Sequence, residues 1–202
     1  MNKVYAIVPA AGHSRRMGTQ KLLLPFAGTT VIEHVIAQLS AAPVRGIFAV
    51  VRATDDAVAA AASRTGATPV VNPDADADML SSVRCGIRAL PPDCDAALVA
   101  LGDQPTVRTG LVSALLEEFA RHPASIVVPS HAGRRGHPVL FPSECFADVL
   151  TRYDGVGLKG LLEQHAARVR ELRVDDETIL HDVDDPEGYA RALRSPGDGR
   201  EE

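Results

Sequence analysis

Cysteine is scarce in this sequence, and its spacing excludes two kinds of stabilising site. The three cysteines are odd in number and form no C-x-x-C pair, and no two of the seven histidines stand four residues apart. A disulfide framework needs an even, closely spaced set, and a zinc site on a helix needs paired ligands. We therefore expect Cys85, Cys94 and Cys145 to be free thiols in a reducing, cytoplasmic setting.

Long apolar runs and an excess of positive charge are also missing. No stretch of 18 apolar residues is present, and no positively charged and then apolar leader opens the sequence, so we expect neither a membrane span nor a signal peptide. A net charge of −5 argues against a nucleic-acid-binding surface. The sequence contains no G-x-S-x-G, so a serine hydrolase is unsupported.

The sequence does contain enough apolar residues for a globular core. Hydrophobic residues make up 46% of the 202 residues and charged residues 23%, values typical of a folded chain. A chain of this length suits one domain. We expect that domain to span residues 1–194, followed by a polar, flexible tail at 195–202.

Apolar runs alternate with helical patterns along most of the chain. The runs that predict strands cover residues 5–9, 47–51, 68–71, 96–101, 126–129, 139–141, 169–172 and 179–181. Helices are expected from a Thr30–Glu33 capping box to about Leu39, and over residues 55–64, 79–90 and 111–121. Such alternation predicts an α/β fold with a mainly parallel sheet covered on both faces, and ligands beyond the carboxyl ends of its strands.

The first predicted strand runs into a loop that combines small residues with cations. Residues 9–12 read Pro-Ala-Ala-Gly, and Arg15, Arg16 and Lys21 follow. Small side chains let the backbone approach a ligand, backbone N–H groups donate to anions, and Arg and Lys add positive charge. The spacing is neither that of the P-loop nor that of G-x-G-x-x-G. As a short motif alone, it is compatible with an anion site and with a solvated turn.

The full string Pro-Ala-Ala-Gly-x-Ser-x-Arg-Met-Gly-x-x-Lys at residues 9–21 resembles the signature loop of the MobA-like nucleotidyltransferases. Within that superfamily the chain is most similar to the molybdenum cofactor cytidylyltransferases, over residues 4–193. The resemblance implies a three-layer, Rossmann-like nucleotidyltransferase fold and catalytic roles for Arg16 and Lys21. It also implies that the nucleotide is bound by Pro9, Ala10, Ala11, Gly12, Arg15, Ser82 and Gly102.

A carboxylate follows the apolar run at 96–101, in the string Gly102-Asp103-Gln104-Pro105. The end of that strand should share a sheet edge with the first loop, and Mg²⁺ prefers hard oxygen ligands. From the residues alone, Asp103 is as compatible with a chain turn or a helix cap as with a metal ligand. The resemblance implies that Asp103 is catalytic and binds Mg²⁺, since Gly-Asp-x-Pro is the metal-binding element of the family.

A second acidic cluster lies near the C-terminus, where residues 182–187 read Asp-Val-Asp-Asp-Pro-Glu. Asp185, Pro186 and Glu187 form a good helix start, which leaves Asp182 and Asp184 unexplained. The segment resembles the Asp-x-Asp-x-Pro element of the family, which implies that Asp184 is a second metal ligand. Two alternatives stay open for Asp182: it is the second metal ligand in place of Asp184, or it is a solvated neighbour.

Two serines begin the helix predicted at 79–90. From the residues alone, a hydroxyl of Ser81 or Ser82 is expected to cap that helix. The resemblance instead places Ser82 near the nucleoside. Asp78 stands where the family usually has glycine, within the acidic run 74–78, so the shape of the base and ribose pocket is open to question.

Residues 133–138, Gly-Arg-Arg-Gly-His-Pro, form a basic segment between two predicted strands. Taken alone the segment is typical of a solvated turn, although Arg and His also bind anions. Gly-His-Pro resembles the family element on the acceptor side, which implies acceptor binding by Gly136, His137 and Pro138. We expect His137 to bind and not to act as a general base, because a phosphate acceptor is already ionised near pH 7.

The resemblance implies an Mg²⁺-dependent enzyme that transfers CMP from CTP to the phosphate of molybdenum-bearing molybdopterin and releases pyrophosphate. CTP is favoured over GTP because this loop reads Ala10-Ala11-Gly12 rather than its Gly-Gly version. A molybdenum hydroxylase would receive the product. Two alternatives stay open: a cytidylyl- or guanylyltransferase for another acceptor, such as a sugar or polyol phosphate, and a non-catalytic nucleotide or cofactor carrier.

Overall fold

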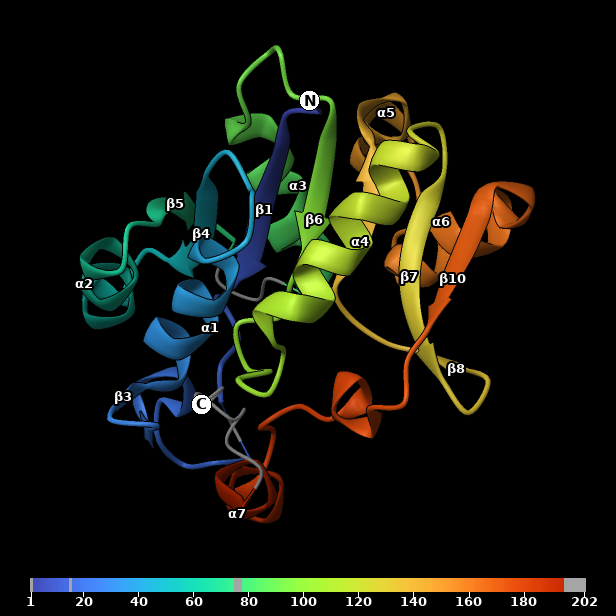
Figure 1. Cartoon of the computed structure of the whole chain (residues 1–202). Coiled ribbons are helices and arrows are strands. Elements are labelled where there is room, and N and C mark those ends of the chain that lie inside the picture. Colours follow the sequence, from blue (N-terminus) through green and yellow to red (C-terminus); the bar gives the residue numbers. More distant parts are fainter. Residues whose placement is uncertain (1, 15, 75–77, 195–202) are drawn as a thin grey trace.

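The computed structural model describes residues 2–14, 16–74 and 78–194, and its centre is a β-sheet (Figure 1). The sheet has the strand order β10-β7-β9-β6-β1-β4-β5. Strand β9 is antiparallel to its neighbours β6 and β7, whereas the other neighbours on this path are parallel. The strands are β1 (Val4–Pro9), β4 (Ile47–Arg52), β5 (Thr68–Asn72), β6 (Ala96–Val99), β7 (Ile126–His131), β9 (Val139–Pro142) and β10 (Val169–Arg173), with the short β8 (Arg134–Arg135) beside β7.

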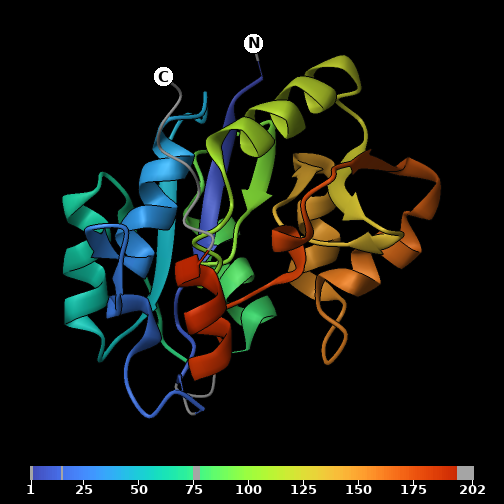
Figure 2. The same ribbon diagram turned by 60° about the horizontal axis from the view of Figure 1, so that its bottom comes forward.

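Helices cover both faces of the sheet, which gives the three layers visible in Figures 1 and 2. Helices α1 (Val31–Ser40), α2 (Asp56–Arg64) and α4 (Thr109–Arg121) share one buried cluster with the sheet. Helices α3 (Met79–Ala89), α5 (Phe146–Thr151) and α6 (Leu158–Gln164) share the other. Within the described ranges, no helix is long and apolar enough to cross a membrane. The predicted α/β fold with a mainly parallel sheet is confirmed.

Strand β1 shows why both faces must be covered. Val8 and Ala6 belong to one buried cluster and Ile7 to the other, and all three are fully buried. Successive strand side chains point to opposite faces, so a continuous apolar run needs an apolar layer on each side. This packing fixes the end of β1, from which the first loop starts.

The predicted capping box begins α1. The Thr30 hydroxyl accepts from the Glu33 N–H at 3.4 Å, and the Glu33 carboxylate accepts from the Thr30 N–H at 3.0 Å. These bonds satisfy two backbone donors that the first helical turn leaves free. Between the first loop and α1 lie a single 3-10 turn, η1 (Lys21–Leu23), and a ribbon of β2 (Pro25–Phe26) and β3 (Thr29–Thr30).

The C-terminal part of the chain returns to the carboxyl edge of β1 and β6. After β10 the chain forms the 3-10 helix η4 (Glu177–Leu180) and then α7 (Pro186–Arg194), which lies near the N-terminal ribbon (Figure 2). The Tyr189 hydroxyl donates to the Pro25 carbonyl, and the Val183 N–H donates to the Asp103 carbonyl at 2.9 Å. The first loop and the second acidic cluster therefore meet at one edge of the sheet.

Two local expectations need correction, and two helices were not foreseen. The strand predicted at 179–181 is wrong: η4 covers Ile179 and Leu180, because the Asp176 carboxylate accepts from the Thr178 N–H and starts a helical turn. Strand β6 ends at Val99, two residues early. Helices α5 and α6 were not predicted, since segments of six and seven residues show too little periodicity. The tail expected at 195–202 lies outside the described residues.

Candidate active site

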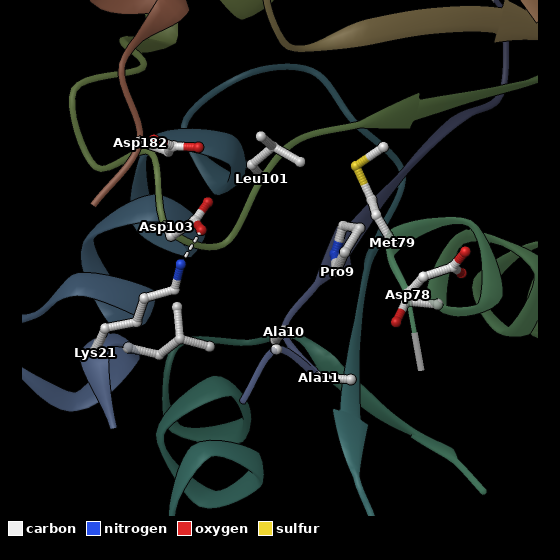
Figure 3. Close-up of a pocket in the computed structure, with 12 residues that line it drawn as sticks. Pro9, Ala10, Ala11, Lys21, Asp78, Met79, Leu101, Asp103 and Asp182 are labelled. Carbon is white, nitrogen blue, oxygen red and sulfur yellow. Dashed lines mark hydrogen bonds and ion pairs between the residues drawn. The ribbon is translucent and has the colours of Figure 1, made fainter. Parts of the chain in front are cut away.

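The first loop lines a cavity of about 220 Å³ at the carboxyl ends of β1 and β6 (Figure 3). Of the residues predicted to bind a nucleotide, those that line it are Pro9, Ala10, Ala11, Gly12 and Ser82. Lys21, Asp103 and Asp182 form its charged side, whereas Asp78 and Met79 lie across it at the start of α3. The position matches the expectation that ligands of parallel sheets bind beyond the strand ends.

Gly102, which was also predicted to bind the nucleotide, is buried and does not line this cavity. Its N–H donates to the Pro9 carbonyl at 3.3 Å, and a Cβ at this position would lie 2.9 Å from the same oxygen. Glycine therefore allows the chain that follows β6 to touch the end of β1. The close approach carries the next residue, Asp103, to the mouth of the first loop.

Lys21 lies at the centre of the charged side. Its ammonium group donates to Asp103 and, at 2.6 Å, to Asp184, and the residue is only 8% exposed. Burial by itself would lower the pKa of Lys21, but the carboxylates of Asp103 and Asp184 outweigh burial and raise it. The lysine therefore remains a cation at neutral pH.

Three carboxylates converge on this point. Oxygens of Asp103, Asp182 and Asp184 all lie within 4.8 Å of one another. Burial opposes ionisation of Asp184, but Lys21 and Arg16 outweigh it and lower its pKa. For Asp182 the pKa is raised, first by partial burial and then by the neighbouring carboxylates. A set of hard oxygen donors with excess negative charge fits a divalent cation such as Mg²⁺ or Mn²⁺.

Asp182, whose role the sequence left open, thus belongs to the same cluster as Asp103 and Asp184. Val183, between the two aspartates, is 1% exposed and packs in the core. Residues two apart in an extended segment share a side, so a buried Val183 places both neighbours on the side of the cluster. The pattern of one apolar residue between two aspartates is therefore the sequence signal that Asp182 lies on the same side as Asp184.

A second cavity, of about 320 Å³, continues from the first around Gly12 and Lys21. Arg16 lines it and donates to Asp184 at 2.6 Å, although its side chain is 70% exposed. A lysine and an arginine thus line this cavity, and side chains of this kind bind phosphates. Arg15, which was also predicted to bind the nucleotide, lies outside the described residues.

A chain of hydrogen bonds that the motif did not predict holds the loop. The Ser14 hydroxyl accepts from the Lys21 N–H at 3.2 Å and donates to the Gln20 side chain at 3.0 Å. Gln20 in turn donates to Asp55 at 3.0 Å, and two nitrogens of Arg52 grip that carboxylate. The backbone of Lys21 is therefore tied to the end of β4, which fixes where its ammonium group can reach.

The start of α3 corrects the interpretation of the two serines. Asp78 caps the helix, with its carboxylate accepting from the Ser81 N–H at 2.7 Å. Ser82 is 2% exposed and receives a weak bond from the Asn72 amide at 3.4 Å. The predicted serine cap is therefore wrong. Ser82 instead lines the first cavity. Asp78, where glycine was expected, has a structural reason to be acidic.

A third cavity, of about 590 Å³, lies beyond Met79, which lines both it and the first. Gly136 and His137 line it, whereas Pro138 is buried after a cis peptide bond and does not. Burial lowers the pKa of His137, so its ring is neutral at pH 7. The bridging position of Met79 was not predicted from the sequence.

Comparisons with known proteins agree with this geometry. Residues 6–169 match the MobA-like NTP transferase domain. The chain is 31% identical to a molybdenum cofactor guanylyltransferase of Mesorhizobium japonicum, with 95% of each chain covered. It is 23% identical to the molybdenum cofactor cytidylyltransferase of Escherichia coli K12, with 95% of this chain and 96% of that one covered. The structure resembles Rv0371c of Mycobacterium tuberculosis H37Rv in complex with manganese, with a TM-score of 0.78, 29% identity and coverage of 96% and 100%. The loop, the carboxylate cluster and the matched length together show that the chain belongs to the MobA-like NTP transferase family.

Proposed function

We propose that the protein transfers CMP from CTP to the phosphate of a molybdopterin-type acceptor that carries molybdenum, and releases pyrophosphate. The observation that carries this proposal is the arrangement around Lys21. One buried ammonium group touches Asp103 and Asp184 at the mouth of a loop rich in anion donors. A nucleotide carrier would need the donors but has little use for the carboxylate cluster beside them.

In this proposal, the two adjoining cavities would hold the two halves of a nucleoside triphosphate. The base and ribose would lie in the first, against Ala10, Ala11 and Ser82. The phosphates would lie over Gly12 and the second cavity, within reach of Arg16 and Lys21. Ala11 lines the first cavity, where a methyl group would disfavour a larger purine, and this supports CTP over GTP.

Asp103 and Asp184, with Asp182 beside them, would hold Mg²⁺. When bound, the ion would supply positive charge that offsets the negative charge of the phosphates. When phosphates and a metal are bound, Lys21 and Arg16 can release their carboxylate partners and neutralise charge on the α-phosphate and the leaving group. Phosphoryl-type transfer depends mainly on positioning and charge stabilisation, and these residues provide both.

The acceptor would approach from the third cavity. Its phosphate oxygen attacks the α-phosphorus in line, a new P–O bond forms, and the bond to pyrophosphate breaks. No proton needs to be removed from an ionised phosphate, in keeping with a neutral His137 that binds but does not act as a base. A molybdenum hydroxylase would then receive the cytosine dinucleotide product.

Pyrophosphate release tests the proposal. We would incubate the protein with Mg²⁺ and CTP, GTP, ATP or UTP, with and without molybdenum cofactor. Release that requires both CTP and the cofactor is the expected result. Release with GTP alone among the nucleotides would contradict the CTP assignment. Release with a sugar or polyol phosphate instead of the cofactor would contradict the acceptor, and binding of CTP without release from any acceptor would favour a carrier.

A further inference from the structure

The Gly-His-Pro element supports the segment that brings Asp182 and Asp184 to the cluster. We call residues 174–184, between β10 and the helix start, the C-terminal strap. Within it the carbonyl oxygen of Ile179 accepts from the His137 N–H at 3.2 Å and from the Gln104 side-chain amide at 3.4 Å. The strap is thus attached to both conspicuous motifs, Gly-Asp-Gln-Pro and Gly-His-Pro.

Gly136 packs directly against the same carbonyl group of Ile179. A Cβ at Gly136 would lie 2.4 Å from the Ile179 oxygen and 2.9 Å from its carbonyl carbon. Real Cβ atoms do not approach backbone atoms this closely, so an alanine here must displace the strap. Ile179 itself is 1% exposed, which leaves it little freedom to move aside.

The displacement would reach the carboxylates. Ile179 precedes Asp182 by three residues, and a second attachment follows at Val183, whose N–H donates to the Asp103 carbonyl. Asp182 and Asp184 flank that second attachment. Because so few residues separate the two points, a shift at the first cannot be absorbed before the carboxylates.

We infer that Gly136 and Gln104, together with the His137 backbone, are positioning residues for the carboxylate cluster. They hold the Ile179 carbonyl and thereby place Asp182 and Asp184 opposite Asp103. This inference rests on the proposed metal site and extends it, since it gives the Gly-His-Pro element a task on the metal side as well as on the acceptor side. Gln104 supports this task because it is 3% exposed and bonds the strap without lining the third cavity.

The test compares Gly136→Ala with Gly110→Ala, a matched control in α4 where a Cβ meets nothing within 4 Å. The first measurement is hydrogen exchange at the Val183 amide without metal, by mass spectrometry of peptides covering the strap. The second is Mn²⁺ affinity, by electron paramagnetic resonance with CTP present and no acceptor. A Gln104→Leu variant, which removes one donor without adding bulk near the strap, serves if Gly136→Ala does not fold.

We expect faster exchange at Val183 in Gly136→Ala and Gln104→Leu, and no change in Gly110→Ala. Mn²⁺ affinity should fall by about 10- to 100-fold in Gly136→Ala, the usual loss when a residue that orients metal ligands is changed. In an Asp182→Asn, Asp184→Asn background the same change should alter Mn²⁺ affinity by no more than about twofold, since the ligands it positions are gone.

Two outcomes overturn the inference: unchanged exchange at Val183 in both variants, or weaker Mn²⁺ binding that persists at full size in the double-asparagine background. If the wild-type protein binds no Mn²⁺, the proposed metal site fails, and exchange at Val183 still decides whether the strap is held as inferred.

Discussion

Lys21 and Asp184 lie 163 positions apart in the sequence, and their side chains form an ion pair of 2.6 Å. The pair joins the first loop to the C-terminal strap at a place where Asp103 also touches the lysine. One ammonium group therefore links three distant segments of the chain. In the resting protein it also balances the carboxylates that would otherwise repel each other.

Replacing Lys21 should abolish most turnover without unfolding the protein. We expect Lys21→Ala to lose about 2.7–4 kcal/mol of transition-state stabilisation, or about 100- to 1,000-fold in kcat, as for deletion of one preorganised donor. Lys3→Ala is the matched control, because that lysine pairs with Asp93 on the exposed surface. Steady-state pyrophosphate release and a thermal melt measure the two effects. Near-normal turnover in Lys21→Ala would remove its assigned role.

Asp103 should govern both metal binding and turnover. Asp103→Asn keeps the shape of the side chain but removes one charged oxygen donor, so Mn²⁺ affinity and kcat should both fall strongly. Asp93→Asn is the matched control, because Asp93 is an exposed carboxylate, and it should change neither Mn²⁺ affinity nor kcat. The measurement is a Mn²⁺ titration followed by electron paramagnetic resonance, alongside the turnover assay. Mn²⁺ affinity equal to that of the wild type would contradict the metal role.

Asp78 caps α3, which stabilises the protein, and it also places a negative charge at the first cavity. A serine at this position would keep the cap and remove the charge. Serine also caps helices, so Asp78→Ser should leave the thermal midpoint close to that of the wild type, whereas Asp78→Ala should lose about 1 kcal/mol of stability. Because the Asp78 carboxylate lines the cavity proposed for the nucleotide, its removal should lower the KM for CTP. A higher KM in Asp78→Ser would show that the carboxylate binds the nucleoside.

The capping box of α1 should stabilise the protein more when Glu33 is ionised than when it is protonated. The Thr30 hydroxyl, together with Arg64, holds the pKa of Glu33 below its ordinary value of 4.5. A carboxyl whose pKa is lower in the folded state contributes stability above its unfolded pKa and loses it as pH falls through the folded one. Thr30→Ala should therefore cost about 1 kcal/mol at pH 7 and less at pH 3, in urea unfolding. An equal cost at both pH values would contradict this coupling.

The three thiols should differ in reactivity. Burial raises the pKa of Cys94 to about 11 and also raises that of Cys145, and both residues are buried, so little thiolate is available at pH 8. Cys85 is only partly buried. Iodoacetamide should label Cys85 first, and the other two only after unfolding, as read by peptide mass spectrometry. Rapid labelling of Cys94 in the folded protein would contradict its burial.

Much of the site was predictable because its loops directly follow apolar strands or precede a helix start, and both are recognisable in the sequence. The residues that follow the apolar runs of β1 and β6 had to reach one sheet edge, whatever their identity, since parallel strands end together. The helix start at Asp185 was equally local, and its carboxylate accepts from the Gly188 N–H at 2.7 Å. The strand expected at 179–181 failed because a cap at Asp176 outweighed a short apolar run.

The sequence by itself determined the α/β alternation, the cationic loop after β1 and the presence of two acidic elements, because periodicity, small residues and helix caps act over a few positions. Tertiary structure alone decided that Met79 lies between two cavities and that Gly136 supports the strap. These features depend on contacts between segments far apart in the chain. Their geometry is set by how the sheet and its covering helices pack, which no local pattern records.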